Sequence, residues 1–293
     1  VVIGHVVSSE SFAHQVIYWF HMPVFFMITG ILSNWGRSDD LAFIKKRTVS
    51  YVVPYFSWCI LLFCIFWIED PLKYLCRILY GGAMNTTSYT YPFWFVCALY
   101  ISSVVYNWFV RRNVKWLYLA IAFFILLWYI VLCKYRVISL PWSLEVVPFV
   151  LLYFIIGIYA NILFDKKVIV CTLVGCVLAL TLMLCAYYGI INNTIGMKSV
   201  EMHNVIFDVF VPVVFFCGLK GICLMMSRIN VLTKLFSYIG KASLVIMFVH
   251  SAMFHVIGNV GIDNDTYLLL FKIVGAVTGG CLIYMGCRRI RVI

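Results

Sequence analysis

The feature that most constrains this chain is a series of long apolar segments, most of them long enough to cross a lipid bilayer as a helix. The runs fall at about 1–8, 16–35, 48–68, 93–110, 115–133, 144–164, 168–188, 204–226, 238–259 and 266–287. None alternates apolar and polar residues, which disfavours a β-barrel. The pattern therefore predicts an all-α polytopic membrane protein, a bundle of about ten transmembrane helices.

Two further segments, the start of the chain and its longest polar interval, bear on the number of domains. The run at 1–8 is too short to span a bilayer, so we expect it to be the second part of a first helix that is truncated at its N-terminus. The longest polar interval, at about 69–92, has the length of a loop only. Residues 1–293 are therefore expected to form a single membrane domain.

Composition excludes an ordinary soluble domain. The chain is 65% hydrophobic and 11% charged, whereas soluble domains are about 45–50% apolar and about 25% charged. A net charge of +11 would also fit a nucleic-acid-binding protein, but the basic residues cluster at the ends of apolar runs. Membrane topology explains that placement, so we expect membrane lipids and no nucleic acid as partners.

The basic residues also predict an orientation. Alternate loops and the C-terminus hold fourteen Lys and Arg residues, and the intervening loops hold five. By the positive-inside rule the rich set faces the cytoplasm, so both termini are expected there. The expected location is the bacterial inner or plasma membrane, crossed several times.

His5, in "VVIGHVVSSE", is the first candidate for chemistry. It lies toward the outer end of the first helix, within reach of water yet flanked by apolar residues. A neutral imidazole in such a place suits a general base. The alternative is a histidine that is hydrogen-bonded to a neighbouring helix.

Other polar residues in apolar runs have structural explanations beside the functional ones. Glu145 follows Pro141 near a helix start, where the helix dipole favours an acid. Arg47 and Lys46 mark the cytoplasmic start of the third helix, which topology explains, although Arg also suits phosphate oxygens. His250 and His255 are not spaced as helical metal ligands, and no CxxC pair occurs, so no metal site is expected.

The stretch "FHMPVFFMITG" combines features that are costly in a membrane helix. Pro23 is expected in the first turns of the second helix, where a missing N–H costs least. Gly30 is expected to let a neighbouring helix approach closely. His21 is expected at the outer mouth of this helix, one short loop from His5.

Six stretches, in order along the chain, resemble the acyltransferase 3 family of integral membrane acyltransferases, especially its fucose 4-O-acetylase-like branch. They are "VVIGHVV", "FHMPVFFMITGIL", "KKRTVSYVVPYF", "PFWFVCALY", "LPWSLEVVPFVLLYFIIG" and "IGKASLVIMFVH". The resemblance implies an O-acyltransferase that moves an acyl group, most often acetyl, from acetyl-CoA to a hydroxyl of a cell-envelope or exported carbohydrate. Acetyl-CoA would be a co-substrate, and no cofactor is expected to stay bound.

The resemblance also implies roles for individual residues. It makes His5 the catalytic base or acyl relay, with Glu145 as a second catalytic residue where the branch usually has Asp. Arg47 and Lys46 would bind the donor. His21, Trp94 and His250, together with Tyr91, would line the acceptor side, in keeping with the Asn-, Thr- and Tyr-rich outer loops at 81–92 and 189–204.

Two alternatives to an enzyme remain at this stage. A polytopic exporter of a glycan or small solute would use intramembrane His and Glu residues as proton-linked groups. A membrane sensor would need no chemistry at all. The enzyme, for its part, must bring a cytosolic donor to a histidine near the outer face, either by a deeply inserted pantetheine arm or by an acyl relay.

Overall fold

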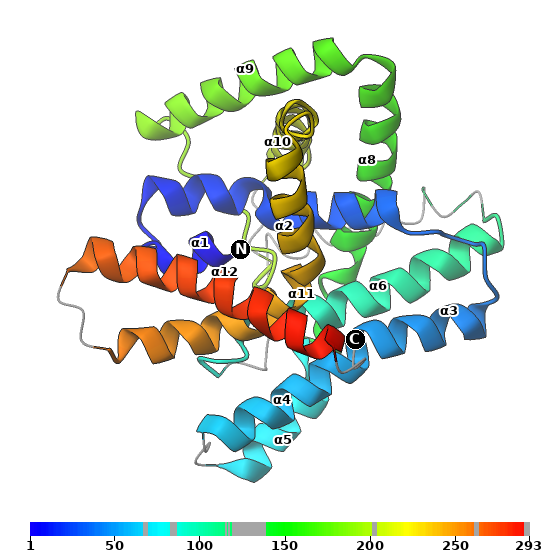
Figure 1. Ribbon diagram of the computed structural model, residues 1–293. Coiled ribbons are helices and arrows are strands. Elements are labelled where there is room, and N and C mark those ends of the chain that lie inside the picture. Colours follow the sequence, from blue (N-terminus) through cyan, green and yellow to red (C-terminus); the bar gives the residue numbers. More distant parts are fainter. Residues whose placement is uncertain are drawn as a thin grey trace.

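The computed structural model describes residues 1–66, 70–82, 87–114, 116, 118, 139–200, 204–260 and 264–289, and among them it contains helices and no strand. The elements are α1 (Val2–Val6), α2 (Phe12–Leu32), α3 (Asp40–Arg47), the π-helical turn η1 (Thr48–Val52), α4 (Val53–Phe66), α5 (Pro71–Tyr80), the 3-10 turn η3 (Tyr91–Phe93), α6 (Trp94–Arg111), the 3-10 turn η4 (Pro141–Ser143), α8 (Val147–Lys166), α9 (Val168–Tyr187), α10 (Val205–Met226), α11 (Asn230–Gly258) and α12 (Asp265–Arg289) (Figure 1).

Within the described residues, eight helical segments are long and apolar enough to cross a membrane. They are α2, α3 continued through α4, η3 with α6, η4 with α8, α9, α10, α11 and α12. These match eight of the ten predicted runs. The first run contains only the short helix α1, and the run predicted at 115–133 lies outside the described residues except for 116 and 118. The predicted class, an all-α polytopic bundle, is confirmed.

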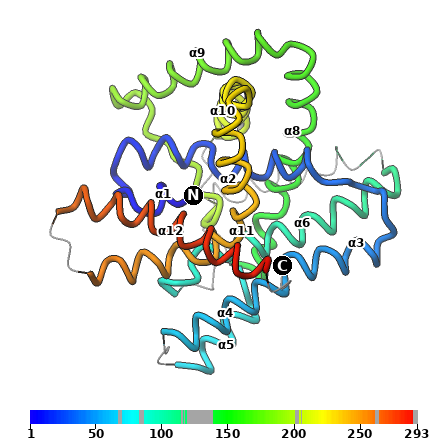
Figure 2. The backbone as a smooth tube through the Cα atoms, viewed as in Figure 1, coloured from blue at the N-terminus to red at the C-terminus, as the bar shows by residue number. Residues whose placement is uncertain are grey.

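The helices pack mainly in pairs. The most extensive contacts join α11 to α12, α9 to α10, and α2 to α8. The short helix α1 lies inside this arrangement, in contact with α2, α11 and α12 (Figures 1 and 2). α1 is therefore surrounded by protein on several sides.

Two glycines bring α2 and α8 into backbone contact. A Cβ atom on Gly30 of α2 would lie 2.6 Å from the carbonyl oxygen of Phe154, and one on Gly157 of α8 would overlap the backbone of Met27. The indole N–H of Trp35 donates to the Gly30 carbonyl oxygen at 2.7 Å. The predicted close approach at Gly30 is thus confirmed, with α8 as the neighbour.

Pro23 does not lie where the sequence predicted. The helix begins earlier than the apolar run, because the Ser11 hydroxyl accepts a hydrogen bond from the His14 N–H at 3.2 Å and caps the helix there. Pro23 is consequently well inside α2. The prediction was wrong because it placed the helix start by hydropathy and overlooked the polar first turn.

The interval at 69–92, predicted as a loop, contains the helix α5. Asp70 caps it, accepting from the Lys73 N–H at 3.0 Å, and Pro71 occupies its first turn. Two tyrosines join α5 to α4: Tyr55 donates to the carbonyl oxygen of Ile78 at 2.9 Å, and Tyr74 donates to that of Cys59 at 3.0 Å. α5 is therefore a short amphipathic helix held against a spanning one.

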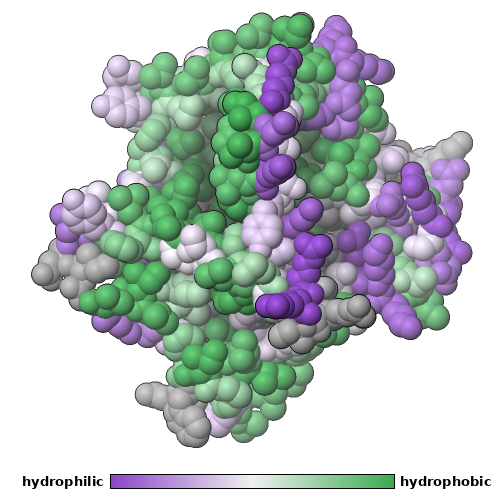
Figure 3. Space-filling model, in the orientation of Figure 1, coloured by the Kyte–Doolittle hydropathy of each residue, from purple (hydrophilic) through white to green (hydrophobic). Residues whose placement is uncertain are grey.

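Charged side chains gather at the helix ends that the sequence assigned to the cytoplasm. Asp40 at the start of α3 lies 2.9 Å from Arg112 and 3.6 Å from Arg111 at the end of α6. Lys220 of α10 pairs with Asp165 of α8 at 2.6 Å. Figure 3 shows hydrophilic atoms gathered mainly on the side where α3 begins and α8 ends, beside a largely hydrophobic surface. The cytoplasmic placement of the C-terminus stays a prediction.

The glycine contact generates a stability prediction. Gly30→Ala should lower the melting temperature of the detergent-solubilised protein, because its methyl group meets the Phe154 backbone and overpacking costs about 1–3 kcal/mol. Gly286→Ala on α12 is the matched control, since no atom of a neighbouring described residue lies within 4 Å of its Cβ position. That change should be neutral or stabilising by up to about 1 kcal/mol through helix propensity. Equal melting temperatures for the two variants would contradict the contact.

Candidate active site

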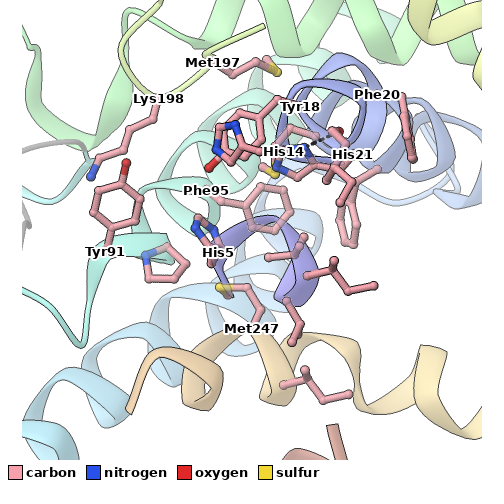
Figure 4. A pocket seen from close by; sticks show the side chains of 18 of the residues that line it. His5, His14, Tyr18, Phe20, His21, Tyr91, Phe95, Met197, Lys198 and Met247 are labelled. Carbon is pink, nitrogen blue, oxygen red and sulfur yellow. Dashed lines mark hydrogen bonds between the residues drawn. The ribbon is translucent and has the colours of Figure 1, made fainter. Parts of the chain in front are cut away.

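A cavity of about 730 Å³ opens among α1, α2, η3, α6, α11, α12 and the segment at 194–199. This volume falls in the range of pockets that bind small molecules, about 300–1,000 Å³. Its walls are mostly apolar, and its polar side chains converge from several elements (Figure 4). They include His5, His14, Tyr18, His21 and Lys198.

His5 projects from α1 into this cavity. Gly4 allows the close approach of α1 to α2, since a Cβ atom there would lie 3.1 Å from the Ile17 side chain. The imidazole of His5 stacks on that of His250, with ring centroids 5.4 Å apart, and meets the Tyr91 ring edge-on at 5.7 Å. No described residue forms a hydrogen bond with its ring nitrogens. They are therefore available to a molecule in the cavity.

His250 of α11 lies behind His5. Its side chain is fully buried and does not line the cavity. Its Nδ1 lies 3.1 Å from the carbonyl oxygen of Ile246, so Nδ1 carries the proton and donates it there. Nε2 has no hydrogen-bond partner among the described residues. The sequence placed His250 on the acceptor side, and the geometry makes it a support for the His5 ring.

One face of α2 contributes three rings in contact with one another. His14 and Tyr18 stack with centroids 3.9 Å apart, and Tyr18 meets His21 at 4.7 Å. Nδ1 of His21 donates to the carbonyl oxygen of Ile17 at 2.8 Å, which leaves Nε2 as an acceptor. The sequence identified His21 but missed His14 and Tyr18. Their spacing of four and three residues along one helix face was the available signal.

The remaining wall combines aromatic rings with one lysine. Trp94, in the first turn of α6, is buried and lines the cavity, and Tyr91 lies one turn earlier with its ring more exposed. The Nζ atom of Lys198 lies over the Tyr91 ring, 3.2 Å from its centroid. Burial lowers the pKa of Lys198 to about 8. The sequence counted Lys198 only as an outer-loop charge and missed its position at the cavity.

Glu145 lies outside the cavity. Its carboxylate accepts a hydrogen bond from the Leu140 N–H at 3.0 Å and closes the turn at η4. In that turn Trp142 and Ser143 both have positive φ, 57° and 54°, an uncommon backbone conformation for residues other than glycine. This placement favours the structural explanation, and the catalytic role of Glu145 stays a prediction.

Arg47 and Lys46 lie at the other end of α2. The Arg47 guanidinium donates to Ser33 at 2.8 Å and to Tyr51 at 2.9 Å, and it packs against the rings of Trp35 and Phe43. Ser33 follows His21 by twelve residues, about 18 Å along a helix. Lys46 is exposed. The predicted donor residues and the cavity residues are thus far apart, at opposite ends of one helix.

No group of three or more His, Cys, Asp and Glu side chains is placed to hold a metal ion in the described part of the chain. The described polar side chains that line the cavity carry imidazole, phenol, hydroxyl, indole and ammonium groups.

Comparison with known proteins identifies the family of this chain. The family model described as an acyltransferase domain, that of the acyltransferase 3 family, matches residues 1–285. The chain therefore belongs to this family of membrane acyltransferases, and the predicted family is confirmed. No curated protein and no solved structure matches the chain. Its assignment to the fucose 4-O-acetylase-like branch stays a prediction.

The burial of the histidines predicts their chemical reactivity. Diethyl pyrocarbonate modifies neutral imidazoles that it can reach, so it should label His5 and His14 through the cavity and spare the fully buried His250. His255, exposed near the end of α11, serves as the positive control. Peptide mass spectrometry measures the extent at each residue. Labelling of His250 as fast as His255 would contradict this arrangement.

Proposed function

We propose that this membrane acyltransferase transfers an acetyl group from acetyl-CoA to a hydroxyl of a cell-envelope or exported carbohydrate. The family supports acyl transfer over the exporter and sensor alternatives. The observation that carries the proposal is the gathering of His5, His21 and Trp94 in one cavity of about 730 Å³. A cavity of this size suits a sugar unit, and its aromatic rings offer flat faces for stacking.

In the proposed reaction His5 acts as the general base. One of its ring nitrogens takes the proton of the sugar hydroxyl while the hydroxyl oxygen attacks the thioester carbonyl carbon. A C–O bond forms, the C–S bond breaks, and the departing thiolate takes the proton back from the imidazolium. Stacking on His250 and contact with Tyr91 hold the ring in place, which supplies the orientation that such a transfer needs.

The acceptor and the donor enter from opposite ends in this proposal. Trp94 and Tyr91 stack on the sugar, and His21 lines the same space. Arg47 contacts the phosphates of acetyl-CoA at the cytoplasmic end, since a guanidinium fork suits phosphate oxygens. Arg47 contacts Ser33 at one end of α2, and His21 lies toward the other end. The extended pantetheine arm, or an acyl relay, must cover the distance between them.

Replacing the proposed base tests the reaction directly. His5→Ala should reduce acetyl transfer from acetyl-CoA by about 10²–10⁴-fold, the usual contribution of a general base. The purified protein in nanodiscs is assayed for thiol release and for acetylated glycan by mass spectrometry. His255→Ala, which alters an exposed histidine away from the cavity, is the matched control. Full transfer by a well-folded His5→Ala variant would rule out this role.

A shortened donor tests the role of Arg47. Arg47→Lys should raise the KM for acetyl-CoA about tenfold, because the lysine keeps the charge but loses the forked hydrogen bonds to phosphate. The KM for S-acetyl-N-acetylcysteamine, which has no phosphate, should not change. Because Arg47 also contacts Ser33 and Tyr51, a structural role predicts equal effects on both donors, and that result would contradict phosphate binding.

A further inference from the structure

The segment at 189–200, which follows α9, covers one side of the cavity. Two side chains of α2 hold its backbone: Gln15 donates to the carbonyl oxygen of Ile191 and Trp19 to that of Asn193, each at 2.6 Å. Three of its apolar side chains are buried in the bundle, those of Ile195, Met197 and Val200. A residue of this segment therefore has a defined position relative to the cavity.

Lys198 belongs to this segment and faces the cavity. It is half-buried, and Figure 4 shows its side chain extending from the segment toward Tyr91. Its Nζ atom lies 3.2 Å from the centroid of the Tyr91 ring, and that ring lies 5.7 Å from His5. The ammonium and the imidazole are therefore no farther apart than the sum of these two distances, a span that one substituted pyranose ring can bridge.

The charged side chains that line the cavity have one sign only. Among the described residues, its lining contains no Asp and no Glu, and Lys198 is the one Lys or Arg residue in it. None of the ion pairs among the described residues includes Lys198. The Tyr91 ring offers the ammonium a cation–π contact but leaves its charge uncompensated. A half-buried cation without a carboxylate beside it is a ready partner for an anion.

We infer that the acceptor is an anionic carbohydrate, and that Lys198 binds its carboxylate or phosphate group while His5 acts on a hydroxyl of the same sugar unit. This inference rests on the proposed function, because it names the acceptor of that reaction. It makes Lys198 a specificity residue: the charge selects the sugar, and Tyr91 holds the ammonium at a fixed distance from the base.

Three sugars that differ at one carbon test the inference in a binding measurement without any acyl donor. They are methyl β-D-glucoside, methyl β-D-glucuronide and methyl β-D-glucoside 6-phosphate, titrated into the full chain in nanodiscs by saturation-transfer NMR. At least one of the two anionic sugars should bind about tenfold more tightly than the glucoside, as expected for one charge-assisted hydrogen bond. Preference for the glucuronide or for the phosphate then tells which anion the site takes.

Lysine variants connect that preference to this side chain. Lys198→Met keeps the apolar stem and should abolish the difference between the neutral and the anionic sugars, whereas Lys198→Arg should retain it. Lys73→Met is the matched control, because Lys73 is exposed on α5 in an interval predicted to lie on the same side of the membrane. Equal binding of the neutral and anionic sugars to the unaltered protein, or a preference that survives in Lys198→Met, would overturn the inference.

The pH dependence gives a second readout. With a pKa of about 8, Lys198 loses its charge as the pH rises from 7 to 9, so the preference for anionic sugars should fade over that range. Among the described residues, the other titratable side chains facing the cavity are Tyr91 on η3, His5 on α1, and His14, Tyr18 and His21 on α2. Lys198→Arg separates their contribution, since its preference should persist to pH 9. Identical pH profiles for the two proteins would count against Lys198.

The binding measurement also separates this inference from the proposed reaction. His5→Gln should lose acetyl transfer yet keep the preference for the anionic sugar, since binding needs no base. Absence of transfer by the unaltered protein would refute the reaction and leave the charge preference standing as an independent result. Transfer with no charge preference would refute the role of Lys198 alone.

Discussion

The close contact between α2 and α8 at Gly30 and Gly157 is the constraint on which the rest of the structure depends. Helices in lipid gain no hydrophobic energy by associating, so they rely on tight packing, which small residues permit. α2 carries the cavity residues near one end and meets Arg47 through Ser33 at the other. The position at which it crosses α8 therefore sets where both ends of the proposed reaction path lie.

The polar side chains in and beside the cavity are subject to a second constraint, because burying a polar group in an apolar environment costs free energy unless it forms a hydrogen bond. Each histidine with a proton on Nδ1 donates it to the backbone of its own helix, as His21 does to Ile17 and His250 to Ile246. The second nitrogen is then left unprotonated. Backbone hydrogen bonds within each helix thus give these two rings a common tautomer, and among the described residues the His5 ring makes no such bond.

Much of the fold could be read from the sequence because membrane insertion acts on local properties. Hydropathy and the positions of Lys and Arg predicted eight of the spanning segments that the structure describes. Prediction failed where short-range hydrogen bonds decided the outcome. The Ser11 cap moved the start of α2 outward and put Pro23 in its interior, and the Asp70 cap turned part of a predicted loop into α5.

By itself the sequence determined the class of protein and the family, and it singled out His5 as a candidate, since each depends on residue type and order. Only the tertiary structure decided which polar residues share a cavity. It placed His14, Tyr18 and Lys198 beside His5, put His250 behind it, and left Glu145 and Arg47 outside. The physical reason is that contacts such as Trp19 with Asn193, 174 positions apart, depend on how the helices cross, and no local pattern in the chain encodes that crossing.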